Sequence, residues 1–279
     1  MSIVATTPAN AVAASRAPSG TRKGVNPRWR RGGRAVIGVA VAIGLWAVVT
    51  SSGAVDTTIF PTVPAFVGAL ADSWQALLLS FEATLQSWAL GMVVGTALGI
   101  VLGVIVGRSY WADASSDIIV RMLRPLPSLA LIPIAVLVAG LGVTMTASLV
   151  AFASFWPIFI NTRYAVRQIE PRLLDSGRAV GLSGWSLVAL VIAPAIAPAV
   201  VTGVRVSVGI AIVVTVSVQL VAGTGGLGGY VLDAQTSGLT NQVFVGVAAG
   251  GVLGWLLNGV FLVAARKLMP WQAARGAGA

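Results

Sequence analysis

Six long apolar runs constrain this sequence more than any other feature. A transmembrane helix needs roughly 20 mostly apolar residues, and the runs lie near 35–54, 85–107, 126–142, 144–162, 199–222 and 243–265. The 279 residues are 57% hydrophobic and only 9% charged, whereas soluble domains carry about 25% charged residues. A soluble fold of this size could not bury so much apolar surface. The sequence therefore predicts an all-α membrane protein of about six transmembrane helices.

The basic residues between the runs all fall on one side of a membrane that is crossed six times. They are Arg108, Arg121 and Arg124 in one loop, Arg163, Arg167, Arg172 and Arg178 in another, and Arg266, Lys267 and Arg275 at the C-terminus. The opposite loops contain four acids and no Lys or Arg. Since cytoplasmic loops are enriched in Lys and Arg, both termini are predicted to be cytoplasmic. Arg205 alone lies within a run, close enough to its cytoplasmic end to act as an anchor.

One membrane domain, 35–270, fills nearly the whole chain. Residues 1–34 are rich in Ala, Ser, Thr and Pro and then basic, a composition that cannot fold alone, and 271–279 form a second short tail. Both tails are predicted to be cytoplasmic, and the first to be disordered. Arg30 and Arg31 ahead of an apolar run could mark an export signal, but several more spans follow. An uncleaved anchor is the simpler interpretation.

Several kinds of chemistry are excluded by what the sequence lacks. It contains no Cys and no His, which removes thiol nucleophiles, haem and zinc ligation and Ser-His-Asp catalysis. It also lacks the Gly-x-x-x-x-Gly-Lys-Ser/Thr phosphate loop. No metal site, no nucleic-acid binding and no enzymatic activity are expected.

The second run contains glycine at every fourth position, which permits close helix packing. These glycines are Gly91, Gly95, Gly99, Gly103 and Gly107. The stripe predicts a contact within the subunit or between two subunits, with a flexing or substrate-lining role as the alternative. Prolines at Pro125, Pro127, Pro133, Pro194 and Pro198 are candidate kinks or hinges.

The loop between the fourth and fifth runs predicts a helix-turn-helix along the membrane surface. Pro171 suits a first helical turn, Gly181 can end that helix in the left-handed conformation, and Ser183 can cap a second helix. Leu173 and Val180 lie seven residues apart on one face. Such exposed apolar side chains need a partner protein or lipid to cover them, and the residues alone do not choose between these.

The same loop resembles the signature loop of permease subunits of bacterial binding-protein-dependent ATP-binding-cassette (ABC) importers. That signature is Glu-Ala-Ala, three residues, Gly, nine residues and Ile-x-Leu-Pro. This chain has Asp175-Ser176-Gly177, then Gly181, then Val191-Ile192-Ala193-Pro194. The stretches 124–133, 155–162 and 226–234 are similar to the branch that serves sulfonates, taurine and nitrate, and together the resemblance covers roughly 65–270.

The resemblance implies a permease, in the bacterial inner membrane, that imports a small polar or anionic solute by alternating access. The loop would be the coupling helix, contacting a cytosolic ATPase through Asp175, Ser176, Gly177, Arg178 and Gly181. ATP and Mg²⁺ would bind to the ATPase and not to this chain. The other implied partners are a second copy of the chain or a homologous permease, an external solute-binding protein and the lipid bilayer.

Polar side chains within the fourth and fifth runs are candidates for the translocation pathway. They are Ser154, Trp156, Thr215, Ser217 and Gln219. None is charged, so this pathway would bind its cargo weakly, and each side chain could instead form an interhelical hydrogen bond. Two positions depart from the family: Gly177 replaces a helix-favouring Ala, and Gln219 stands where many relatives have Glu.

The sequence leaves two other functions to consider. An ion-coupled secondary transporter usually carries acids or His within the bilayer, and the predicted spans contain neither. A non-transporting membrane scaffold would explain the glycine stripe but not the coupling-type loop.

Overall fold

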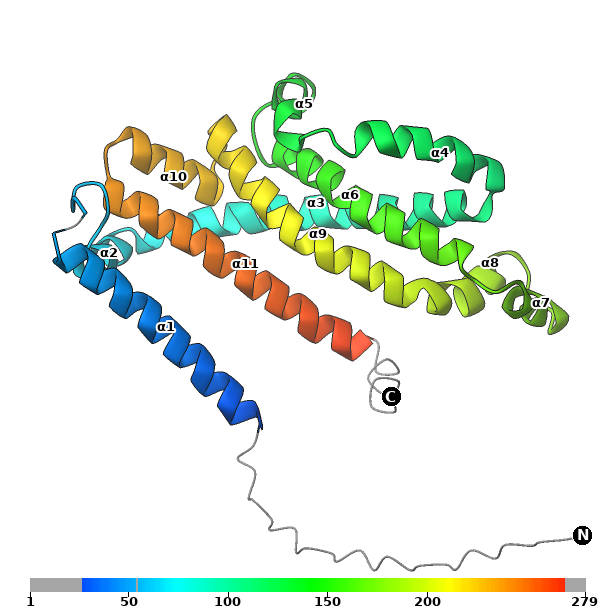
Figure 1. Ribbon diagram of the computed structural model, residues 1–279. Coiled ribbons are helices and arrows are strands. Elements are labelled where there is room, and N and C mark those ends of the chain that lie inside the picture. The colour runs from blue at the N-terminus through cyan, green and yellow to red at the C-terminus, as the bar shows by residue number, and fades with distance from the viewer. Residues whose placement is uncertain (1–26, 54, 269–279) are drawn as a thin grey trace, which may run out of the picture. The chain divides into compact units, whose positions relative to one another are not determined.

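Every regular element of the described chain is helical. The computed structural model describes residues 27–53 and 55–268 (Figure 1). Four stretches are long and apolar enough to cross a membrane: α3 (Trp74–Arg108), α6 (Val143–Arg167), α11 (Thr240–Leu268) and Gly184–Thr236, whose main helix is α9 (Ala193–Ala222). A fifth candidate is a bent pair of helices. The predicted all-α membrane fold is confirmed, whereas the count of six crossings stays a prediction.

Most of the first predicted span belongs to a separate compact unit, which ends at Val48. Its helix, α1, runs over Pro27–Ser51. Residues 27–34 of the predicted tail are therefore helical, since Pro is favoured in a first turn and Arg is a good helix former. The rest of that tail and the predicted tail 271–279 lie outside the described residues.

The third predicted span is a broken helix. α4 (Tyr110–Leu123) ends just before Pro125, and after Pro127 the chain continues as the short 3₁₀ helix η1 (Ser128–Leu131) and α5 (Ile132–Ala139). The two halves are bent by 84°, as expected where prolines remove helical hydrogen bonds and restrict the residue before them. The sequence assigned α4 to a loop, and this was wrong.

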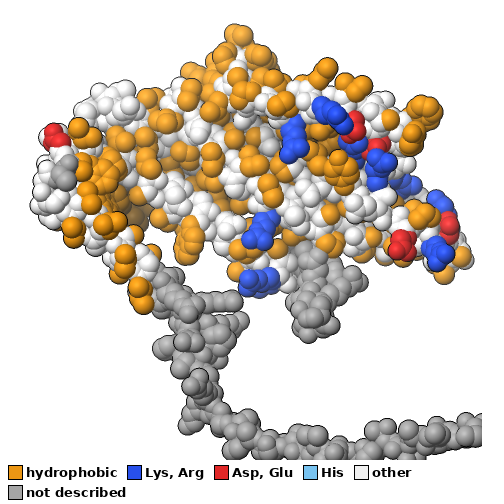
Figure 2. Space-filling view, viewed as in Figure 1, with side chains coloured by type: hydrophobic (Ala, Val, Ile, Leu, Met, Phe, Trp, Pro, Cys, Tyr) orange, Lys and Arg blue, Asp and Glu red, His pale blue; other side chains and the backbone are white. Residues whose placement is uncertain are grey.

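The remaining helices lie at the two ends of the long ones. α2 (Val63–Asp72) precedes α3, and α10 (Gly226–Thr236) follows α9 and contacts α9, α11 and α3. At the opposite end, α6 is followed by α7 (Pro171–Ala179), α8 (Gly184–Leu187) and the π-helical turn η2 (Val188–Ile192) that leads into α9. Most charged side chains visible in Figure 2 lie toward this second end.

α6 lies at the centre of the long helices and packs on both α3 and α9. The glycine stripe of α3 faces it. A Cβ on Gly91 would lie 2.5 Å from Val150 Cβ, one on Gly99 2.9 Å from Ile158 Cβ and one on Gly103 2.7 Å from Thr162 Cβ. Gly95 and Gly107 also meet α6, at Ser154 and at Arg163 and Val166 respectively. The stripe thus forms a helix–helix seam within the subunit.

A buried ion cluster joins α4 to α6. Arg163 is 2% exposed and its Nε pairs with Asp113, which is 5% exposed; Arg163 Nη2 lies 2.6 Å from Asp117 Oδ1. Arg167 pairs with the second carboxylate oxygen of Asp113. The six predicted spans contain no acid, but the candidate fifth span includes α4, whose Asp113 and Asp117 pair with arginines of α6.

Candidate functional site

The predicted helix-turn-helix is present after α6. Pro171 stands at the start of α7, Gly181 has φ +86°, and Ser183 is the N-cap residue of α8, with its N–H donating to Ser186 Oγ (3.0 Å). Two backbone hydrogen bonds close the turn: Gly181 N–H donates to Arg178 O (2.9 Å) and Leu182 N–H to Gly177 O (3.0 Å). We refer to residues 171–187 as the α7–α8 hairpin.

The hairpin exposes large apolar side chains in the structure of this chain. Leu173 is 46% exposed, Val180 77% and Trp185 81%. Near them the Arg178 Nη1 lies 3.1 Å from Asp175 Oδ1, in an exposed ion pair. Apolar side chains displayed beside charges on a protruding hairpin are typical of a contact surface.

One of the five predicted contact residues does not lie on that surface. Asp175, Ser176, Arg178 and Gly181 are exposed, but Gly177 is buried. A Cβ at Gly177 would come within 2.8 Å of Leu187 Cδ1 and 3.2 Å of Val191 Cγ2. Glycine at position 177, where the family signature has Ala, therefore permits α7 to lie close to α8 and η2.

Two of the predicted pathway residues are enclosed between helices. Ser154 and Thr215 are fully buried, and their hydroxyls donate back to Val150 O (2.8 Å) and Ala211 O (2.7 Å) of their own helices. The backbone O of Ser154 also accepts a hydrogen bond from Ser207 Oγ (2.8 Å), which joins α6 to α9. The side-chain hydrogen bonds of Ser154 and Thr215 thus stay within their own helices, and the bond that crosses between helices comes from Ser207. Ser217 is half-buried on α9.

Gln219 is also closed off, and it holds α10 in place. It is 2% exposed, its Oε1 accepts from Thr84 Oγ1 (2.9 Å) and from Gly228 N–H (3.4 Å), and Thr84 Oγ1 accepts from Leu227 N–H (2.8 Å). Gly226 also lies against the Gln219 amide, where a Cβ would collide. The neutral amide thus serves as a junction of α3, α9 and α10.

Trp156 differs from the other pathway candidates because it lines a cavity. The cavity has a volume of about 400 Å³, and its walls come from the break after α4, from α6 and from α9. The lining includes Arg124, Ser128, Phe152, Trp156, Asn161 and Val206. Trp156 packs edge-to-face with Phe152 and Phe155, at centroid distances of 5.8 and 4.9 Å. Sequence reasoning missed Arg124 because it treated α4 as a loop.

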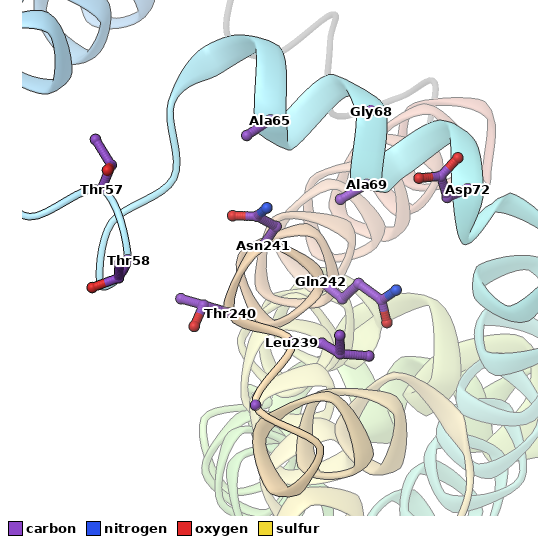
Figure 3. A pocket seen from close by; sticks show the side chains of 11 residues that line it. Thr57, Thr58, Ala65, Gly68, Ala69, Asp72, Leu239, Thr240, Asn241 and Gln242 are labelled. Atoms are coloured by element: carbon purple, nitrogen blue, oxygen red, sulfur yellow. The ribbon is translucent and has the colours of Figure 1, made fainter.

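A second cavity lies at the end of the long helices remote from the hairpin. Its volume is about 460 Å³, and Figure 3 shows Ala65, Ala69 and Asp72 of α2 across from Asn241 and Gln242 at the start of α11. The loop beside it is fixed by Asp56, whose pKa is lowered because the N–H and hydroxyl of Thr58 donate to its carboxylate (2.9 and 2.8 Å). This polar surface has Asp72 as the one charged residue in its lining.

Comparison with known proteins gives one consistent picture. Residues 95–273 match the family described as binding-protein-dependent transport system inner membrane component. A putative aliphatic sulfonates transport permease of Bacillus subtilis is 30% identical, over 94% of this chain and 94% of the relative. A taurine transport system permease of Escherichia coli is 29% identical over 71% of each chain. A nitrate import permease of Synechococcus elongatus is 24% identical over 91% of this chain and 97% of its own length.

Solved structures agree on the fold. The inward-facing MetNI methionine ABC transporter aligns with a TM-score of 0.54 over 74% of this chain and 98% of that chain. At 20% identity this likeness concerns the fold alone.

Proposed function

Because the chain belongs to the family of binding-protein-dependent transport system inner membrane components, it is a permease of an ABC importer, and we propose that it carries a small sulfonate-, taurine- or nitrate-like anion. The proposed cargo rests on relatives that are named as permeases for aliphatic sulfonates, taurine and nitrate. Membership of this family disfavours both the ion-coupled transporter and the scaffold.

The family implies an ATPase, a solute-binding protein and a pair of permeases as partners. In our proposal ATP and Mg²⁺ bind to the ATPase alone, and two copies of this chain, or this chain and a homologue, enclose the path. Binding of ATP favours one of two permease conformations, so hydrolysis cycles the path between its two openings.

The α7–α8 hairpin is our candidate for the contact with the ATPase. The exposed Leu173, Val180 and Trp185 are the observation that supports this role. Apolar side chains of this size bury well in a protein groove, and each contributes about 1.5–3 kcal/mol when fully covered. Asp175, Ser176 and Arg178 would flank this apolar contact, with Gly177 behind it.

The proposed orientation has both termini and the hairpin in the cytoplasm. The charge pattern supports it, because Arg172 and Arg178 lie on the hairpin and Arg266 and Lys267 lie in the last turn of α11. The polar cavity between α2 and α11 would then face outward, toward the solute-binding protein.

Reconstitution tests the function directly. The chain, its ATPase and its binding protein are placed in proteoliposomes, and ATP-dependent uptake of ethanesulfonate, taurine and nitrate is measured. Uptake of at least one of the three, dependent on both partners, is expected. Binding-protein-stimulated ATP hydrolysis without uptake of any of them would contradict the proposed cargo class.

A further inference from the structure

Arg124 lies at mid-depth of the long helices and not in the cytoplasmic loop that the sequence predicts. It is the C-cap residue of α4 and lines the 400 Å³ cavity. Across from it, Phe152 and Trp156 lie in the middle third of α6, and Val206 in the middle third of α9. Since α6 and α9 are both long enough to span the bilayer, the middle of each lies far from either water interface.

The charge of Arg124 is not neutralised within the described part of the chain. The ion pairs found there belong to Arg163, Arg167 and Arg178, and no Asp or Glu lines the cavity. Asp117, the acid of α4 nearest to it in sequence, is paired with Arg163 at 2.6 Å. An unpaired cation at the bilayer centre costs several kcal/mol, so such residues are rare and usually serve function.

The cavity has the chemistry of a site for an anion with a small apolar part. A guanidinium presents N–H groups in a plane that matches two oxygens of a sulfonate or nitrate. Ser128 and Asn161 add a hydroxyl and an amide; Asn161 Nδ2 already donates to Pro157 O (2.7 Å), which leaves its second N–H. Phe152 and Trp156 provide an apolar wall for a short carbon chain.

The backbone around Arg124 is broken at the same place. Pro125 and Pro127 separate α4 from η1 and α5, and the bend is 84°. Non-helical backbone is tolerated at membrane depth where it lines a polar cavity, and broken helices near the midplane commonly form transport sites. The break, the charge and the cavity therefore coincide.

We propose that Arg124 is the anion-binding residue of the translocation path, and that the cavity it lines holds the oxyanion group of the cargo during its passage. This inference rests on the proposed function for the identity of the cargo. It also replaces the uncharged path expected from the sequence by one that carries a fixed positive charge.

The charge can be tested without transport, because the chain contains no cysteine. Ser128→Cys puts one thiol into the cavity of the assembled complex, where its reaction rates with an anionic (sulfonatoethyl) and a cationic (trimethylammonium-ethyl) methanethiosulfonate are compared. We expect the anion-to-cation rate ratio to fall at least about fivefold when Arg124→Gln is added. The matched control, Arg121→Gln on α4, removes an arginine that does not line the cavity and should leave the ratio within about twofold. An unreactive thiol, or an equal fall in both variants, would overturn the inference.

Uptake then tests the role in transport. In proteoliposomes containing the ATPase and the binding protein, Arg124→Gln should lower initial uptake of the transported anion about tenfold or more. Arg124→Lys should retain part of the rate, and hydrolysis stimulated by the binding protein should persist in both. Wild-type uptake by Arg124→Gln would overturn the inference. If the wild type carries none of the three anions, the proposed cargo fails, while the thiol result still decides whether the cavity attracts anions.

Discussion

The α3–α6 seam and the α7–α8 hairpin use glycine and charge in opposite ways. In the seam, five glycines bring two long helices together, and the Asp113–Arg163 pair beside it is almost fully buried. In the hairpin, Gly181 supplies a left-handed turn, and the side chains of the Asp175–Arg178 pair are more than half exposed. Large apolar side chains also remain uncovered there.

The difference separates a rigid body from a contact element. Close backbone packing and buried charges make any change in the seam costly, because the surrounding helices cannot relax freely. The hairpin has few such constraints, so it can be altered without unfolding the chain. Substitutions in the two regions can test this separation.

The largest loss of stability is expected at the buried ion cluster. Arg163→Met leaves Asp113 buried with Arg167 as its one remaining partner, and breaking such a pair costs about 3–5 kcal/mol. The control is Asp175→Asn in the hairpin, where an exposed pair contributes about 0.2–1 kcal/mol. The stability of both variants is measured by unfolding the purified chain in mixed micelles with increasing dodecyl sulfate.

A double variant sharpens the same comparison. Asp113→Leu combined with Arg163→Met removes both buried charges, and apolar replacements of buried pairs are often close to neutral. We expect it to recover much of the stability lost in the single variant. Equal losses for Arg163→Met and Asp175→Asn would show that burial does not distinguish the two regions.

Gly99→Leu should have the next largest effect, through overpacking of the seam. Its Cβ would lie 2.9 Å from Ile158 Cβ and 3.2 Å from Phe155 O, and neither atom is the end of a flexible side chain. Overpacking costs about 1–3 kcal/mol. Gly259→Leu in α11 is the control, because a Cβ there meets no atom within 4 Å of the described structure. A comparable shift of the thermal aggregation midpoint in both variants would argue against the seam.

Gly181→Pro should disturb coupling more than stability. Proline fixes φ near −65°, which cannot reproduce the φ of +86° at Gly181, and it removes the hydrogen bond to Arg178 O. The backbone strain should lower the free energy of unfolding by about 1–3 kcal/mol, and it is confined to an exposed turn. In reconstituted complexes we expect insertion and ATP hydrolysis to persist while uptake is lost. Gly181→Asn, which tolerates the left-handed region, is the control. Normal uptake with normal stimulated hydrolysis in Gly181→Pro would refute the assignment of the hairpin.

Local signals in the sequence were enough to predict most of the helices and the hairpin. Long apolar runs correspond to α3, α6, α9 and α11, and the turn at Gly181 follows from residues within a few positions of it. Gly177 shows the limit of local reasoning: its lack of a side chain matters because Leu187 lies against it, and that contact depends on the turn between them.

Non-local pairing is what the sequence could not reveal. Asp113, Asp117 and Arg121 dilute the apolar character of α4, so hydropathy alone assigns it to a loop. Their neutralisation by Arg163 and Arg167 becomes visible only once α4 lies along α6. For the same reason the depth of Arg124 was missed. A polar residue within a span also does not reveal which face it occupies, so the enclosure of Ser154 and Gln219 had to come from the structure.

The smallest effect is expected for Gly177→Ala, a change that would be severe in the seam. Glycine in a helix interior costs about 0.5–1 kcal/mol relative to alanine, so the substitution favours α7. Against this gain, the new Cβ would lie 2.8 Å from Leu187 Cδ1 and 3.2 Å from Val191 Cγ2. Both atoms are side-chain ends, and a small rotation of Leu187 relieves the closer contact, unlike the contacts with Ile158 Cβ and Phe155 O at Gly99. The gain in helix propensity and the cost of the closer contact should nearly cancel. We expect the free energy of unfolding to change by no more than about 0.5 kcal/mol, and uptake to be unchanged. A decrease of more than about 1 kcal/mol in the free energy of unfolding, measured by the dodecyl sulfate titration, would mean that α7 and α8 are packed as rigidly as α3 and α6. The contrast between the two regions would then fail.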